Sequence, residues 1–148
     1  MVDTNTKPVT ATVKTGVVIH GAGKIVNYDT TGIDLTGANE IALAITASDS
    51  SRTAAGVLDT AAGATCSVYP LGGVLMVQNV AGETYTFGDL VYAQASGLAG
   101  KTSSSRKLLG IYVGAGVTTA ALGANGAGDT TNTEGTLIPV ATAGAATA

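Results

Sequence analysis

Short apolar runs, separated by turn-forming residues about every 8–12 positions, constrain the fold of this chain more than any other feature. The first run, residues 9–14, alternates Val, Ala and Val with Thr, Thr and Lys, which is the period of a strand with one buried face. Further runs of strand length follow at 16–20, 24–28, 41–46, 55–59, 65–70, 73–80, 84–87, 89–94, 107–116 and 117–122. This spacing predicts an all-β fold, a compact antiparallel β-sandwich or barrel.

The two ends of the chain differ from this pattern, and we expect them to form extended arms. Residues 1–15 are predicted to be an N-terminal arm with the first strand, 16–122 a β-rich domain, and 123–148 an Ala/Gly/Thr-rich C-terminal arm. In the last segment, residues 136–141 (TLIPVA) form one apolar cluster. Pro139 lacks an N–H, so we expect this cluster at a sheet edge or against a neighbouring subunit.

Two local features complete the prediction of the fold. Residues 16–20 and 24–28 flank Gly-Ala-Gly, which indicates a hairpin. Residues 45–56 contain the one stretch with a Ser or Asp cap and a composition compatible with a helical turn.

The composition favours a protein that works in an assembly. Charged residues make up 11% of the chain, less than half of the roughly 25% usual in soluble domains. A surface of Thr, Ser, Ala and Gly gives little protection against association. The net charge of −3 and the scattered basic residues argue against nucleic acid as a partner. The uncharged stretches 60–82 and 108–128 are interrupted by glycine and polar residues, so neither predicts a membrane span.

The stretch ASGLAGKT, residues 95–102, is close to the phosphate-binding pattern G-x-x-x-x-G-K-[ST], with Ala95 in place of the first glycine. A phosphate loop needs a helix after it, whereas SSSRKLLGIYV follows here and favours a strand. We therefore interpret the stretch as a loop between two antiparallel strands, in which Gly97 and Gly100 adopt positive φ.

Other patterns associated with catalysis or metal binding are incomplete. The G-x-G at 114–116 has Thr119 where a dinucleotide site has its third glycine. The single histidine, His20, is far in sequence from the single cysteine, Cys66, so no zinc site has ordinary ligand spacing. No G-x-S-x-G motif is present, and two acidic clusters lack the spacing of a calcium loop (Asp34-Asn39-Glu40 and Asp129-Asn132-Glu134). We expect no enzyme, no cofactor and no metal.

Residues 81–116 carry a resemblance to a known family. They contain Phe87-Gly88-Asp89-x-Val91-Tyr92, a Gly- and Thr-containing loop, and a strand with Leu109-Gly110-Ile111, followed by the alanine-rich 117–122. This order resembles the small β-rich capsid decoration proteins of tailed bacteriophages. Residues 54–77 are similar in rhythm to the trimeric head-stabilising proteins of lambda-like phages. The resemblance covers about residues 40–122.

The resemblance implies a structural virion protein on the outer surface of the capsid. Such a cement protein binds the major capsid protein of the expanded head, as a homotrimer, and stabilises the head against the pressure of packaged DNA. We expect the N-terminal segment to contact the capsid (Thr4, Thr6, Pro8, Val9, Thr10 and Val13) and the C-terminal cluster to contact a neighbouring subunit (Leu137, Ile138 and Val140). In FGDLVY, we expect Gly88-Asp89 to form a tight turn, with Leu90 and Tyr92 on one face and Val91 on the other.

Two alternatives stay open. One is a virion surface module that binds host carbohydrate, although a chain with no Trp and one Phe has few aromatic platforms for sugars. The other is a different structural subunit of the head or tail.

Overall fold

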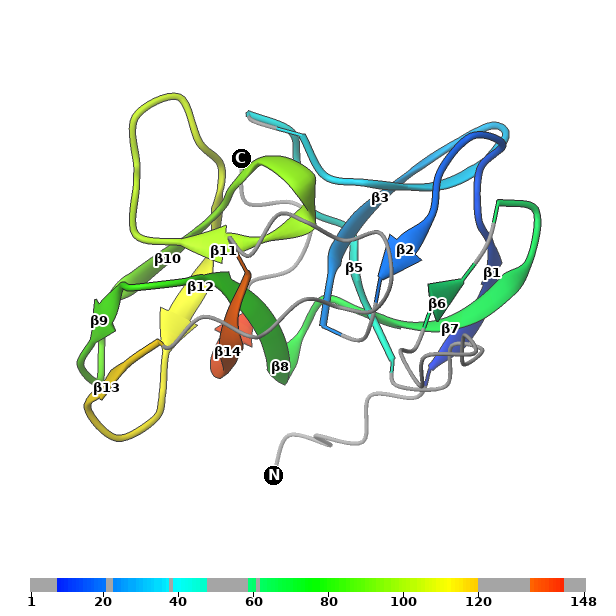
Figure 1. The fold of residues 1–148 in the computed structure, drawn as a ribbon. Coiled ribbons are helices and arrows are strands. Elements are labelled where there is room, and N and C mark those ends of the chain that lie inside the picture. Colours follow the sequence, from blue (N-terminus) through cyan, green and yellow to red (C-terminus); the bar gives the residue numbers. More distant parts are fainter. Residues whose placement is uncertain are drawn as a thin grey trace.

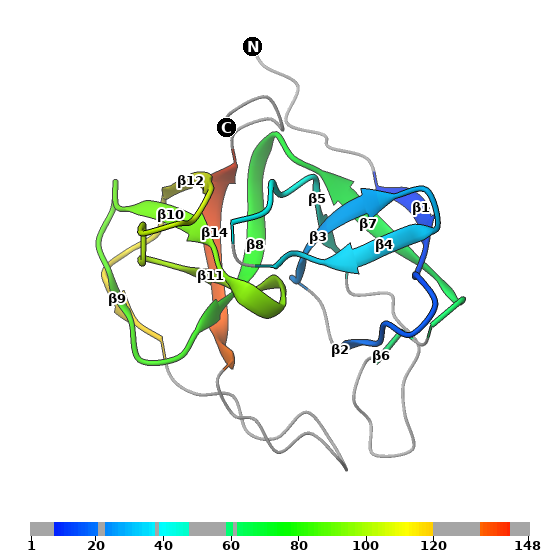
Figure 2. The same ribbon diagram turned by 90° about the horizontal axis from the view of Figure 1, so that it is seen from above.

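The computed structural model describes residues 8–20, 23–37, 39–47, 59–60, 62–119 and 134–142. The fold is all-β, as predicted, and consists of two five-stranded units side by side (Figures 1 and 2). The first, here called the first sheet, has the order β1 (Val9–Thr12), β7 (Thr65–Pro70), β5 (Ala44–Thr46), β3 (Ile25–Asp29) and β4 (Gly32–Leu35). The second is a closed barrel of β10 (Leu90–Ala93), β11 (Ala99–Gly100), β8 (Gly73–Val80), β14 (Glu134–Thr142) and β12 (Leu108–Tyr112).

Two short ribbons and a 3₁₀ turn complete the described structure. β2 (Ile19–His20) pairs with β6 (Asp59–Thr60), and β9 (Thr84–Tyr85) pairs with β13 (Val117–Thr118). The 3₁₀ turn η1 (Ala95–Gly97) lies between β10 and β11. The proposed helical turn at 45–56 begins in strand β5 and otherwise lies almost wholly outside the described residues. No helix in the described ranges is long and apolar enough to cross a membrane.

The first sheet curls until its two edges meet. All of its neighbouring strands are antiparallel, and a parallel bridge from Val13 to Ile33 joins the end of β1 to β4. The N–H of Lys14 donates to the carbonyl of Ile33 at 3.0 Å. The curled sheet encloses a core of eight buried residues (Ala11, Val13, Ile19, Val26, Ile33, Ala44, Cys66 and Val68). The alternation predicted for residues 9–14 places Ala11 and Val13 in this core.

The hairpin expected from residues 16–28 does not form. β2 pairs with β6, whereas β3 pairs with β4 and β5. The actual hairpin is β3–β4, which turns at Thr30-Thr31 between Asp29 and Gly32. The Asp29 carboxylate accepts a hydrogen bond from the N–H of Thr31 at 2.7 Å, and this side-chain bond closes the turn.

The second buried cluster combines barrel residues with Ile25, Ala42 and Ile45 of the first unit, and β14 is a central strand of the barrel. β14 pairs with β8 along most of its length and with β12 at its C-terminal end. The expectation that this segment lies in an arm, at a sheet edge, is therefore wrong. Pro139 lies one residue beyond the last pair of β12 and β14, Tyr112 with Val140, and its carbonyl accepts from the N–H of Val113 at 3.1 Å. The ranges 1–7, 120–133 and 143–148, which hold the rest of the expected arms, lie outside the described residues.

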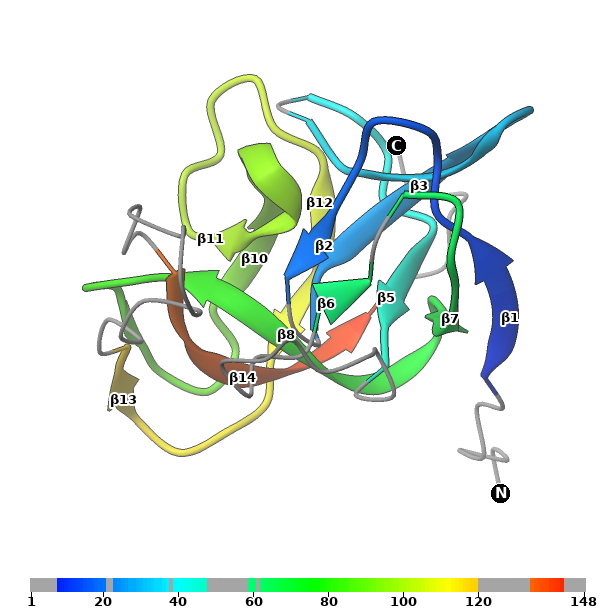
Figure 3. The same cartoon turned by 45° about the vertical axis from the view of Figure 1, so that its right-hand side comes forward.

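The chain passes from one unit to the other where β7 continues into β8 through Leu71 and Gly72 (Figure 3). Two backbone hydrogen bonds between described residues join the units elsewhere. The N–H of Gln78 donates to the Gly23 carbonyl at 2.8 Å, and the N–H of Gly97 donates to the Thr36 carbonyl at 3.0 Å. The stretch resembling a phosphate loop thus holds the barrel against the first sheet.

The prediction for this loop is confirmed in part. Its flanking strands β10 and β12 are antiparallel neighbours, and Gly97 has a φ of 69°. Gly100 does not have positive φ, because it lies extended in β11, and Ser96 takes the second left-handed position instead, with a φ of 61°. A Cβ on Gly97 would lie 2.8 Å from the carbonyl oxygen of Ile25, so only glycine fits this contact.

Candidate interaction surfaces

The outer surface of the barrel carries a row of exposed apolar side chains across four strands. Leu90 on β10 is paired with Ile111 on β12, Ile111 with Ala141 on β14, and Ala141 with Val74 on β8. Directly paired residues of antiparallel strands point to the same face of a sheet. Their neighbours along the strands, such as Val91 and Val140, are buried, so this row points away from the core.

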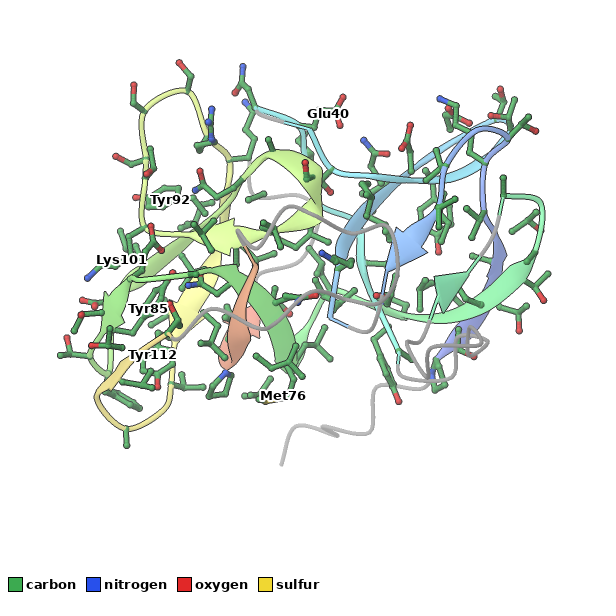
Figure 4. All side chains as sticks on the ribbon, in the orientation of Figure 1. Glu40, Met76, Tyr85, Tyr92, Lys101 and Tyr112 are labelled. Carbon is green, nitrogen blue, oxygen red and sulfur yellow. The ribbon has the colours of Figure 1, made fainter. Side chains whose placement is uncertain are left out.

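A second row lies beside the first. Met76 on β8 is paired with Pro139 on β14, and the exposed Leu137 follows two residues before Pro139. Met76 is 50% exposed and Val74 is 58% exposed, which is unusual for large apolar side chains on a long strand. Figure 4 shows Met76 projecting from β8, away from the tyrosines at the far end of the barrel. We call this surface the barrel face, defined by its large exposed side chains (Val74, Met76, Leu90, Ile111 and Leu137).

The barrel face carries no charged side chain. Residues 73–80 of β8, 108–112 of β12 and 135–142 of β14 contain no Asp, Glu, Lys or Arg. The face ends where the first sheet begins, since Gly23 packs beside Leu137 and accepts the backbone hydrogen bond of Gln78. The face is therefore a neutral, apolar area bounded on one side by the other unit.

The second candidate surface is the free edge of β1. Along residues 9–12, no described strand pairs with β1 on the side away from β7. The N–H of Val13 donates to the carbonyl of Ala64, and the carbonyl of Ser67, opposite Thr10, accepts instead from Ala47 beyond β5. Since hydrogen-bonded pairs alternate along antiparallel strands, the N–H of Thr10 points to the open side, whereas at Thr12 this side is closed by Gly32 of β4. This edge can accept a strand from another chain.

The residues expected to contact the capsid differ in their exposure. Pro8, Val9 and Thr10 are exposed at the start of β1, whereas Thr4 and Thr6 lie outside the described residues. Val13 is 1% exposed, because the alternation of the strand directs it into the core of the first sheet. Its side chain cannot contact a capsid, and that part of the expectation is wrong.

The residues expected to contact a neighbouring subunit also differ in their exposure. Ile138 and Val140 are buried in the core of their own barrel, where they pair with Val77 and Leu75. They are therefore unavailable to a neighbouring chain. Leu137, which directly precedes Ile138 and points to the opposite face of the strand, is 42% exposed on the barrel face.

The end of the barrel near β9 holds a buried polar cluster. Tyr85 is fully buried, and its hydroxyl lies 2.6 Å from Asn79 Oδ1 and 2.8 Å from Glu83 Oε2 (Figure 4). Asn79 in turn donates to the hydroxyl of buried Thr119 at 3.2 Å. Burial, together with the Glu83 carboxylate, raises the pKa of the Tyr85 phenol. A phenol that stays protonated and bonded in this way has a structural role.

Lys101 covers this cluster from outside. Its Nζ lies 5.5 Å from the centre of the Tyr85 ring and donates to Asp89 Oδ2 at 2.8 Å and to the Thr84 carbonyl at 2.9 Å. The hydrogen bond from Lys101 lowers the pKa of the Asp89 carboxyl group. Asp89 also accepts from the N–H of Thr86 and so closes the turn at Gly88, where φ is 97°. The tight turn predicted for FGDLVY is confirmed, with Val91 buried, Leu90 exposed and Tyr92 partly exposed.

The lysine in the phosphate-loop-like stretch therefore pairs with Asp89 and with the backbone of β9. In the described residues, no three His, Cys, Asp or Glu side chains converge as a metal site would require. Of the first acidic cluster, Asp34 pairs with Lys14 at 3.3 Å and Glu40 accepts from Asn27 at 2.7 Å. Asp129 and Asn132 of the second cluster lie outside the described residues, as does the side chain of Glu134.

Sequence reasoning missed the barrel face, although part of its signal was present. The run GVLMVQNV is apolar on both faces of the strand, which in a lone barrel indicates that one apolar face points outward. The sequence did not indicate that β14 forms part of the barrel face, because its partner strands β8 and β12 are distant in sequence.

Comparisons with protein-family models, with curated proteins and with solved structures found no match to this chain.

Proposed function

We propose that the protein is a structural virion protein that binds the outer surface of a phage capsid and stabilises the expanded head. The observation that carries this proposal is the neutral barrel face, on which five large apolar side chains are exposed across four strands. Apolar surface of this kind marks a protein that functions in contact with other proteins. The resemblance of residues 81–116 to capsid decoration proteins supports the major capsid protein as the partner.

The proposed contact with the capsid is the free edge of β1 and the segment before it. Val9 is 48% exposed, and the N–H of Thr10 points away from β7. An extended segment of the capsid protein can add to such an edge through main-chain hydrogen bonds. Each contact is weak, but a repeating capsid lattice supplies many of them. The subunit is proposed to act as a homotrimer, without enzyme activity or cofactor.

Co-sedimentation with purified expanded heads of the encoding virus tests the proposal. Thr10→Pro removes one N–H from the free edge and leaves the pairing with β7 intact, because proline is tolerated where the N–H faces away from the sheet. We expect Thr10→Pro to lose head binding and Thr10→Val, which keeps the N–H, to retain it. Equal binding by both variants would rule out the β1 edge as the capsid contact.

The carbohydrate-binding alternative makes a different prediction for the same preparation. Its most exposed aromatic platforms in the described residues are Tyr28, at 43%, and Phe87, at 74%, and they lie on different units. A chain that ignores heads but is retained on a glycan array, with retention lost on substitution of one of these residues, would favour that function.

A further inference from the structure

The barrel face has the dimensions of the centre of a protein–protein interface. Four strands spaced about 4.8 Å apart span about 14 Å, and the five positions from Leu137 to Ala141 span about 14 Å along the strand. A standard interface buries about 800 Å² on each partner and surrounds an apolar centre with a polar rim. The face supplies such a centre, and the partly polar surface around it supplies a rim.

The absence of charge on the face restricts what can bind there. A partner selected by charge complementarity needs charged residues to complement, and the described outward side chains of β8, β12 and β14 offer none. At a symmetric contact between identical chains, in contrast, each side chain near the axis meets its own counterpart. Any charge there would face an identical charge, so a neutral apolar face fits this geometry.

We propose that the barrel face is the surface through which copies of this chain bind one another, with Met76 near the axis of symmetry. Two or three copies can place their faces together around such an axis, which covers Val74, Met76 and Leu137. This inference rests on the proposed function in one respect, because a homotrimer requires a contact between copies of the chain. Its test uses no capsid, so its failure is distinguishable from a failure of head binding.

The first test is the mass of the full chain in solution, measured by light scattering. The wild-type chain is expected as an oligomer, and Met76→Glu as a monomer of 14.4 kDa at pH 7, because the substitution brings carboxylates together in an apolar contact. Val18→Glu is the matched control, since Val18 is similarly exposed, at 42%, but lies on the first unit. It is expected to keep the wild-type mass, and circular dichroism verifies that both variants are folded.

A second measurement identifies the partner as the same face of another copy. Met76→Lys is expected to be monomeric alone, and an equimolar mixture with Met76→Glu is expected to recover oligomers, because opposite charges then meet at the axis. A monomeric wild-type chain, or an oligomeric Met76→Glu variant, would overturn the proposal. A mixture that stays monomeric would also overturn it, since the face would then bind a different surface. A monomeric wild-type chain that still binds heads would leave the proposed function intact.

Discussion

Tyr85 illustrates how single residues hold the barrel together. The centre of its ring lies 5.2 Å from that of Tyr112, and its hydroxyl donates to the buried Asn79 and to the partly exposed Glu83. The sequence predicted a strand at residues 84–87, and β9 lies there, but the burial of Tyr85 depends on Lys101, 16 positions further along. Local periodicity carries no information about such a distant partner.

Removing the Tyr85 hydroxyl is expected to weaken the fold. Tyr85→Phe keeps the ring but leaves the buried Asn79 Oδ1 without this donor, which costs about 1–3 kcal/mol of unfolding free energy, whereas Glu83 Oε2 still accepts from the N–H of Lys101. Urea denaturation measures the change. Tyr92→Phe is the control, because Tyr92 is only partly buried, and a loss no larger than in that control would contradict the role assigned to the hydroxyl.

The ion pair between Lys14 and Asp29 predicts a pH dependence. The two side chains are 2.8 Å apart, and hydrogen bonds from Lys14 and Thr31 lower the pKa of Asp29 below its usual value near 4. A carboxylate with a lowered folded-state pKa stabilises the protein above its unfolded-state pKa, and this stabilisation is lost as the pH falls. The urea concentration at the unfolding midpoint should therefore decrease in the wild-type chain as the pH is lowered below about 4.

Lys14→Met provides the comparison for this prediction. It removes the cation whose hydrogen bond does most to lower the pKa of Asp29, so the urea midpoint should fall less between pH 7 and pH 3 than in the wild-type chain. The exposed position of the pair keeps the effect small. Identical pH profiles for the two proteins would show that the pair contributes nothing measurable.

At the scale of elements, strand positions followed from the sequence more readily than strand partners. The alternation of residues 9–14 and the runs at 65–70 and 73–80 correspond to β1, β7 and β8. The partner of β2 is 39 positions away, at β6, so the turn signal at 21–23 suggested the wrong hairpin. β14 was assigned to an arm because small residues surround it, although the barrel supplies strands on both of its sides.

The contact of η1 with the first sheet makes Gly97 a sensitive position. Gly97→Ala introduces a Cβ 2.8 Å from the Ile25 carbonyl at a φ of 69°, so the two units must shift apart. Gly82→Ala is the control, since Gly82 has a φ of 83° but open space around its Cβ position. We expect the first variant to lose on the order of 1–3 kcal/mol more unfolding free energy than the second. Similar losses in urea denaturation would contradict a role for η1 as a joint.

The whole molecule combines two small cores with two different open surfaces. One buried cluster lies within the first unit, and the other combines barrel residues with Ile25, Ala42 and Ile45 of the first unit. The units are therefore joined by shared apolar packing as well as through β7–β8, Gly23 and Gly97. The β1 edge belongs to the first unit and the barrel face to the second. This separation allows one surface to bind a capsid while the other binds copies of the chain, which is the arrangement that a trimeric head-stabilising protein needs.

The stability of DNA-filled heads tests the proposed function most directly. The temperature at which a DNA-binding dye gains access to the packaged genome is measured with and without saturating amounts of the chain. The proposed function predicts that bound protein raises this temperature, and that Thr10→Pro, which fails to bind, leaves it unchanged. Heads that carry the wild-type protein but release their DNA at the same temperature as bare heads would contradict a stabilising role.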